Sequence, residues 1–204
     1  GNQIESLDLS GNGAAATYNL NNTGDLPTTV TFSGSQNVTM NMTLAQSDAL
    51  NADAAGGVTD NSSATTTVQI SDTVTDGKTF LKTNSDTLEF QSAVTSGATF
   101  TVNNGATVNM TTNAQTNDFV VKIDDGATTN GTAGSVTLGF AKTSTNATNA
   151  GAITVDQSAD ALTAMTVNFT TENQTAAAGT TGGFNLQAGA TVDVTLSGAV
   201  DVEM

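Results

Sequence analysis

The sequence predicts an all-β fold, an antiparallel β-sandwich of jelly-roll type built from many short strands. Two observations favour this fold: apolar residues recur at every second position through most of the chain, and turn-forming residues separate the alternating runs. A third is composition, because threonine, which suits the solvated face of a pleated sheet, supplies 40 of the 204 residues. We expect residues 1–204 to form a single β domain.

The predicted strands follow from this alternation, taken in chain order. The clearest run spans residues 36–44, where Val38, Met40 and Met42 share one face and asparagine and threonine occupy the other. The apolar runs are Leu7/Leu9, Tyr18/Leu20, Val30/Phe32, Val38/Met40/Met42/Leu44, Val68/Ile70, Leu88/Phe90, Phe100/Val102, Val108/Met110, Phe119/Val121/Ile123, Val136/Leu138/Phe140, Ile153/Val155, Val167/Phe169, Phe184/Leu186, Val192/Val194/Leu196 and Val200/Val202/Met204.

Helix is predicted at only two places. One spans residues 48–55, with Ser47 as N-cap and Gly56-Gly57 as the stop, and the other spans residues 159–165 after Ser158. Each holds about two turns, which is too short for stability without tertiary packing.

A β-hairpin is predicted between two similar segments, residues 97–102 and 105–110. A three-residue loop, Asn103-Asn104-Gly105, would pair Val102 with Ala106 and Phe100 with Val108. It would also place Gly105 at the left-handed position that such loops require. A two-residue loop would instead set apolar residues against polar ones.

A β-solenoid is the alternative to the sandwich. The two similar octapeptides GATFTVNN and GATVNMTT, which follow each other directly, also suit two stacked parallel strands. Eight residues cannot complete a coil, however, and the period of about twenty residues that a solenoid coil requires does not persist along the sequence. The sandwich is therefore preferred.

The composition argues against catalysis and against several partners. The chain has no histidine, no cysteine and no tryptophan, and all four of its basic residues are lysines. It therefore lacks an imidazole base, a thiol nucleophile and a guanidinium clamp, and we predict that it is not an enzyme. A net charge of -15 disfavours nucleic acid, and no apolar run is long enough for membrane insertion.

Calcium is the one cofactor that the sequence suggests. Carboxylates near turns are the ligands that this hard cation prefers, although aspartate is also a common turn residue that bonds the local backbone. The candidate ligands form three pairs: Asp72 with Asp76, Asp124 with Asp125, and Asp156 with Asp160.

Nine Asn-x-Ser/Thr sequons raise the question of glycosylation. In a chain this rich in asparagine and threonine many such triplets arise by chance, so both interpretations stay open. The sequons begin at Asn21, Asn37, Asn41, Asn61, Asn109, Asn130, Asn146, Asn168 and Asn173.

Two stretches carry a resemblance in style to known proteins: TSGATFTVNNGATVNMTTN and LQAGATVDVTLSGAVDVEM. They resemble bacterial and archaeal surface-layer proteins, adhesin passengers and secreted β-rich filament subunits. The resemblance implies export, assembly on the cell surface and a frequent use of calcium. It carries over no functional residue.

Two functions are consistent with these observations. The first is a structural subunit that polymerises into an extracellular filament or surface layer by pairing strands between copies. The second is an adhesin or phage-fibre type module that recognises a surface glycan or receptor. For the first, residues 1–9 are the preferred donor strand over the C-terminal run 191–204, and a flexible hinge completes the segment 1–13, because exposed strands recruit partners. The alternative, that both termini pair within their own domain, stays open.

Overall fold

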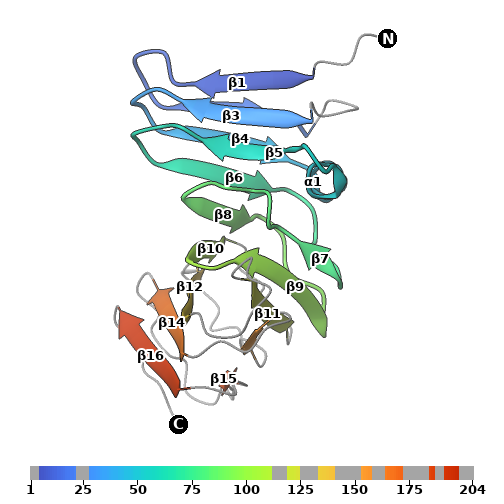
Figure 1. Cartoon of the computed structure of the whole chain (residues 1–204), viewed down its shortest axis with the longest axis vertical. Coiled ribbons are helices and arrows are strands. Elements are labelled where there is room, and N and C mark those ends of the chain that lie inside the picture. Colours follow the sequence, from blue (N-terminus) through green and yellow to red (C-terminus); the bar gives the residue numbers. More distant parts are fainter. Residues whose placement is uncertain are drawn as a thin grey trace, which may run out of the picture.

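The chain winds into a parallel β-solenoid, in which each coil contributes one odd-numbered and one even-numbered strand (Figure 1). The computed structural model describes residues 5–21, 28–111, 119–124, 133–140, 153–157, 164–171, 184–186 and 191–197. The strands are β1 (Ser6–Ser10), β2 (Ala16–Asn19), β3 (Thr29–Ser33), β4 (Val38–Met42), β5 (Gly57–Asp60), β6 (Thr66–Ile70), β7 (Lys78–Thr79), β8 (Thr87–Phe90), β9 (Ala98–Asn103), β10 (Ala106–Met110), β11 (Phe119–Asp124), β12 (Ala133–Phe140), β13 (Ile153–Gln157), β14 (Ala164–Thr171), β15 (Phe184–Leu186) and β16 (Thr191–Ser197).

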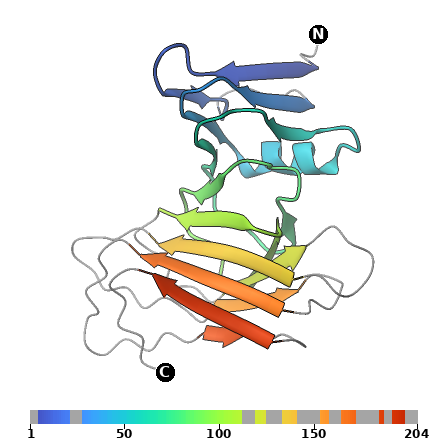
Figure 2. The ribbon, with the colours of Figure 1, turned by 60° about the vertical axis from the view of Figure 1, so that its left-hand side comes forward.

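The strands form two sides of the solenoid. On the even side, the strands from β2 to β16 make one unbroken eight-stranded sheet. On the odd side, a three-stranded sheet of β1, β3 and β5 is followed by a five-stranded sheet from β7 to β15. Figure 2 shows β10, β12, β14 and β16 stacked side by side, coloured from yellow-green to red.

The predicted antiparallel sandwich is wrong, because every strand pair is parallel. Alternation of apolar and polar residues fixes which face of a strand is buried. The same alternation occurs in parallel and in antiparallel sheets that have one solvated face, so it does not report the direction of the neighbouring strands. The arrangement agrees with the solenoid alternative.

The predicted strand positions are much closer to the structure than the predicted pairing. Every strand except β5 and β7 falls on an alternating apolar run. The two exceptions are short, and β5 (GVTD) holds a single large apolar residue while β7 (KT) holds none. The last predicted run, from Val200 to Met204, lies outside the described residues.

The predicted hairpin is also wrong. β9 pairs with β7 and β11, and β10 pairs with β8 and β12, so the two strands lie on opposite sides of one coil. The local expectation for the turn is confirmed, since Gly105 has a φ of 81°. The chain turns sharply at this glycine as predicted, but β10 then joins a different sheet from β9 and does not pair with it.

The coil period is present but interrupted. Val68, Leu88 and Val108 are successive neighbours on the even side, at intervals of 20 residues (68, 88, 108). The preceding interval, from Met40 to Val68, is 28 residues, because the helix α1 (Leu44–Ala52) is inserted between these coils. Such insertions leave the strands aligned while they hide the period in the sequence.

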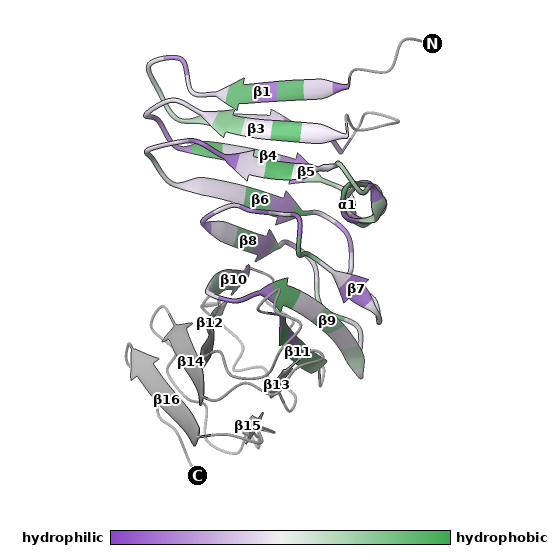
Figure 3. Ribbon diagram, in the orientation of Figure 1, coloured by the Kyte–Doolittle hydropathy of each residue, from purple (hydrophilic) through white to green (hydrophobic). Residues whose placement is uncertain are grey.

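Stacked apolar side chains fill the interior. One inward column of the even side runs through Met40, Val68, Leu88, Val108 and Leu138, all of them buried. The alternation of hydrophobic and hydrophilic residues appears as green and purple-to-white bands along the upper strands in Figure 3. This continuous core holds the coils together, since each coil contacts mainly its neighbours.

A cluster of phenylalanines lies inside the central coils. The ring centroids of Phe90 are 5.3 Å from Phe80 and 5.2 Å from Phe100, and Phe100 stacks on Phe119 at 5.9 Å. All four side chains are buried. Offset and edge-to-face contacts of this kind add to the stabilisation from burial.

The helix prediction is partly confirmed. α1 begins after Thr43, four residues earlier than the predicted N-cap Ser47, and it ends before Asp53. Most of the second predicted helix lies outside the described residues, and its last two residues, Ala164 and Met165, begin β14. In the described part of the chain, no helix has the length and apolar character needed to span a membrane.

Candidate functional site

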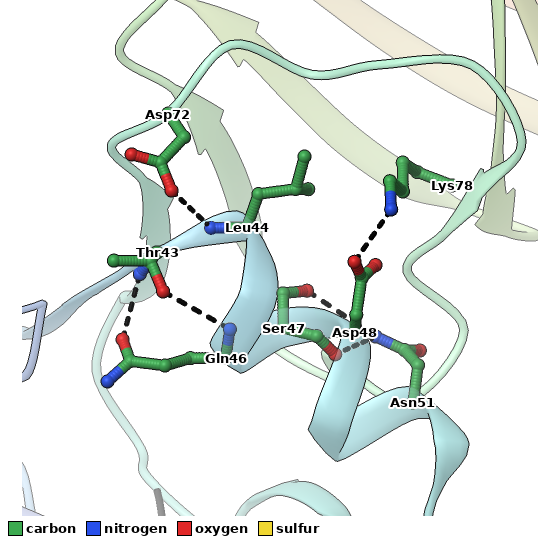
Figure 4. A network of polar contacts seen from close by, with 8 residues as sticks. All are labelled: Thr43, Leu44, Gln46, Ser47, Asp48, Asn51, Asp72 and Lys78. Carbon is green, nitrogen blue, oxygen red and sulfur yellow. Dashed lines mark hydrogen bonds and ion pairs between the residues drawn. The ribbon is translucent and has the colours of Figure 1, made fainter. Parts of the chain in front are cut away.

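The first predicted calcium pair, Asp72 and Asp76, contacts the backbone. Leu44 N–H, at the start of α1, donates to Asp72 Oδ2 at 2.9 Å (Figure 4). Thr99 N–H donates to Asp76 Oδ1 at 2.8 Å. Each carboxylate thus satisfies a backbone donor of a neighbouring segment, which is the ordinary role of aspartate at turns and helix starts.

The other predicted pairs are only partly described. Asp124 ends β11, where its carbonyl oxygen accepts from Asn104 N–H at 2.8 Å. Asp156 pairs in register with Lys122 in the neighbouring strand. Asp125 and Asp160 lie outside the described residues.

No metal cluster is formed by the described side chains. Among them, no three aspartate or glutamate residues gather closely enough to hold an ion together. Calcium binding therefore stays a prediction, and the pairs that it concerns are distributed along separate coils.

The polar network around α1 ties the helix to the next coil (Figure 4). Thr43 and Gln46 form a capping box, in which each side chain accepts from the backbone N–H of the other residue. Lys78 Nζ lies 2.7 Å from Asp48 Oδ2, and Lys82 N–H donates to Asn51 Oδ1 at 2.9 Å. The helix is thus fastened to the segment that contains β7.

A second polar cluster surrounds Thr66, whose side chain is fully buried. Its hydroxyl donates to Asp60 Oδ2 and accepts from Asp86 N–H at 3.1 Å. In return, Thr66 N–H donates to Asp86 Oδ2 at 2.9 Å. One threonine therefore links the turns of two successive coils.

Sequence reasoning missed this cluster, although a signal was present. Thr66 has the same parity as Val68 and Ile70, so the alternation places a polar side chain on the buried face of the strand. A buried hydroxyl requires a hydrogen-bond partner. Asp60 lies six residues before Thr66 in the same turn, whereas Asp86 comes from the next coil, 20 residues away, and cannot be identified from local spacing.

A groove of about 460 Å³ lies beside this cluster, next to the break between β5 and β7. Its walls combine carboxylate, amide and hydroxyl groups, and Phe80 contributes to its lining. Several of these polar groups are already engaged: Asn103 Nδ2 donates to Leu81 O at 2.8 Å and to Asn84 Oδ1 at 3.0 Å. The groove is a feature of the turn architecture more than a preformed ligand site.

A column of threonines follows the outward face of the even side. Thr17 pairs with Thr39, Thr39 with Thr67, and Thr67 with Thr87. Farther along, Thr107 pairs with Thr137. β-branched side chains stacked in register on a wet sheet face favour the extended backbone and pack against their neighbours.

Four of the sequon asparagines occupy two kinds of place, while Asn130, Asn146 and Asn173 lie outside the described residues. Asn37 and Asn61 are exposed in turns between odd and even strands. Asn41 and Asn109 lie on the outward face of β4 and β10. Glycosylation stays a prediction at all of them.

The first coil ends the stack with unpaired strand edges. β1 pairs with β3 alone and β2 pairs with β4 alone, so within the described residues no strand covers their outer edges. Leu7, Tyr18 and Leu20 of this coil are only partly buried against the core. The predicted donor segment, residues 1–9, includes most of β1, which here pairs with β3 of its own chain.

Comparison with known protein families, curated proteins and solved structures gives no match for this chain. The function must be argued from the fold and its surfaces alone.

Proposed function

We propose that this chain is a non-enzymatic structural subunit of an extracellular filament or surface layer. The observation that carries the proposal is the unbroken, in-register even side, whose end strands keep a free edge in the described part of the chain. A parallel stack of coils is extended by adding a coil, and an open row of N–H and C=O groups recruits another strand.

The chemistry of the described polar groups supports a structural role. The carboxylates of Asp60, Asp72 and Asp76 all accept hydrogen bonds from backbone N–H groups, which lie in a turn, at the start of α1 and in β9 respectively. They hold the coils in place instead of converging on a substrate. The secreted or cell-surface location that we propose rests on the resemblance in style to surface-layer proteins, adhesin passengers and secreted filament subunits, which implies export.

Electron microscopy of the purified chain, with and without millimolar calcium, tests the proposal. Ordered polymers or lattices in either condition are the expected result. Monodisperse particles in both conditions would overturn it. Polymers that form only with calcium would also support the predicted role of that ion.

The groove beside Thr66 favours a second candidate function, a module that binds a surface glycan. Its hydroxyl, amide and carboxylate lining suits a polar ligand. It ranks second because Asp60 and Asn103 already use their side chains within the protein. Monodisperse particles that bind an immobilised glycan, with loss of binding in Asn84→Ala, would favour this function.

A further inference from the structure

Asparagine is followed directly by glycine at three places in the chain: Asn12-Gly13, Asn104-Gly105 and Asn130-Gly131. The third pair lies outside the described residues. The first two pairs have the same local form, since Gly13 and Gly105 have φ values of 78° and 81° and a Cβ added to either would meet no atom within 4 Å. They are therefore a matched pair within one molecule, and they differ in what holds them.

The chemistry of this dipeptide depends on two of its groups. Asparagine is a thermolabile residue, because the backbone nitrogen of the next residue can attack its side-chain carbonyl carbon. A glycine in the next position favours the attack, since it has no Cβ to hinder the approach. The nitrogen has to lose its proton, and the side-chain amide has to rotate to meet it. A hydrogen bond that holds either group therefore opposes the reaction.

At Asn104 both groups are held by one residue of the next coil, Ser135 in β12. Gly105 N–H donates to Ser135 O at 2.8 Å, and Ser135 N–H donates to Asn104 Oδ1 at 2.8 Å. The backbone of Asn104 is held as well, because its N–H donates to Asp124 O at 2.8 Å. Asn104 and Gly105 are exposed to water, but their reactive groups are engaged.

At Asn12 the reactive groups are not tied to a neighbouring coil. Gly13 N–H donates within the turn, to Gly11 O at 3.2 Å, which is at the long end of the range for such bonds. Asn12 is exposed, and among the described residues no hydrogen bond holds its side chain. The turn itself is well placed, since a Cβ on Gly11 would lie 2.6 Å from Gln36 Cβ. The reactive dipeptide is thus the open part of a fixed turn between β1 and β2.

We propose that Asn12 is a site of non-enzymatic modification, at which asparagine is converted to aspartate or isoaspartate much faster than at Asn104. The Gly13 nitrogen loses its proton and attacks the side-chain carbonyl carbon of Asn12, so that a new C–N bond closes a cyclic imide. The bond from this carbon to the side-chain nitrogen breaks, and the nitrogen leaves as ammonia. Water then opens the imide at either of its carbonyl carbons, which gives aspartate or isoaspartate.

The products change the first coil in two ways. Both add a negative charge to a coil whose described residues already include Glu5 and Asp8. Isoaspartate also adds a methylene group to the backbone of the turn that joins β1 to β2. Tyr18 closes this turn, because its hydroxyl donates to Ser10 O at 2.6 Å, so the longer backbone has to be accommodated beside that bond. The loss of ammonia makes the change one-way.

Peptide mapping by mass spectrometry tests the proposal on the full chain, incubated at mildly alkaline pH. In the native chain Asn12 should convert faster than Asn104 by roughly 5- to 150-fold, because two hydrogen bonds have to open at Asn104. In concentrated urea the two rates should become similar, since glycine follows both residues. Asn12→Gln should slow the build-up of acidic chains, because the longer side chain cyclises less readily, and the matched variant Asn104→Gln should not.

The results that would overturn the proposal are equally defined. Equal rates at Asn12 and Asn104 in the native chain, or a faster rate at Asn104, would contradict it. Conversion of Asn12 in urea but not in the native chain would show that the turn protects this residue, which also contradicts it. A difference between the two rates that persists unchanged in urea would show that Ser135 is not the cause.

Discussion

The two sides of the solenoid are built by the same coils, yet one is continuous and the other is broken. On the even side eight strands pair without a gap, whereas the odd side is divided between β5 and β7. The break comes from residues 78–83. Lys78 and Thr79 pair with β9, while Thr83 bridges to Val58 of β5.

This difference shows that a solenoid tolerates a broken sheet where other contacts hold the segment at the break in place. Inside the coil, Phe80 contacts Phe90 and Phe100. Outside it, Asn51 of α1 accepts from Lys82 N–H. Across the break itself, Val58 N–H of β5 donates to Lys82 O at 2.7 Å, so a backbone hydrogen bond and the inserted helix connect the two odd-side sheets.

The largest expected effect comes from removing the aromatic side chain at the break. Phe80→Ala should lower the free energy of unfolding by about 3–5 kcal/mol, because it leaves a cavity among buried rings. Thr79→Ala, at the adjacent exposed position, is the control and should change it by less than about 0.5 kcal/mol. Chemical denaturation measures both, and equal effects would show that the cluster does not support the break.

The buried hydroxyl that links the turns should matter next. Thr66→Val keeps the shape but leaves Asp86 N–H without this acceptor, and we expect a loss of about 1–3 kcal/mol in unfolding free energy. Thr67→Val, one residue along on the outward face, is the matched control. If the two variants melt at the same temperature, the polar cluster does not join the coils.

A smaller effect is expected from the helix cap. Thr43→Ala removes the capping box and should destabilise α1 by about 0.5–2 kcal/mol. Hydrogen exchange should become faster for the amides of residues 44–52. Protection in β8 should be unchanged, and a loss of protection there would mean that the helix supports the whole stack.

The surface ion pair should contribute least. The side chains of Lys78 and Asp48 are 25% and 40% exposed, so a double-mutant cycle with Lys78→Met and Asp48→Asn should give a coupling of about 0.2–1 kcal/mol. At about 1 M salt the coupling should disappear because of screening. A coupling that persists at high salt would show that the pair is effectively buried.

The position of the strands could be predicted from the sequence, but the candidate sites could not. Val38, Met40 and Met42 alternate with polar residues, and all three are buried as expected. Asp72 and Asp76 were recognisable as turn aspartates, but their partners, Leu44 N–H and Thr99 N–H, come from other coils. Contacts between coils depend on how the chain winds from one coil to the next. The local sequence around a residue does not reveal this.

By itself, the sequence determined the β content, the buried face of nearly every strand whose burial is described and the left-handed glycine at position 105. These features follow from local sterics and from burial of alternate side chains. Only the tertiary structure decided that the strands pair in parallel, that β9 and β10 separate into two sheets, and that the odd side breaks at β7. Pairing partners are chosen by contacts between residues twenty or more positions apart, and inserted segments such as α1 hide that spacing in the sequence.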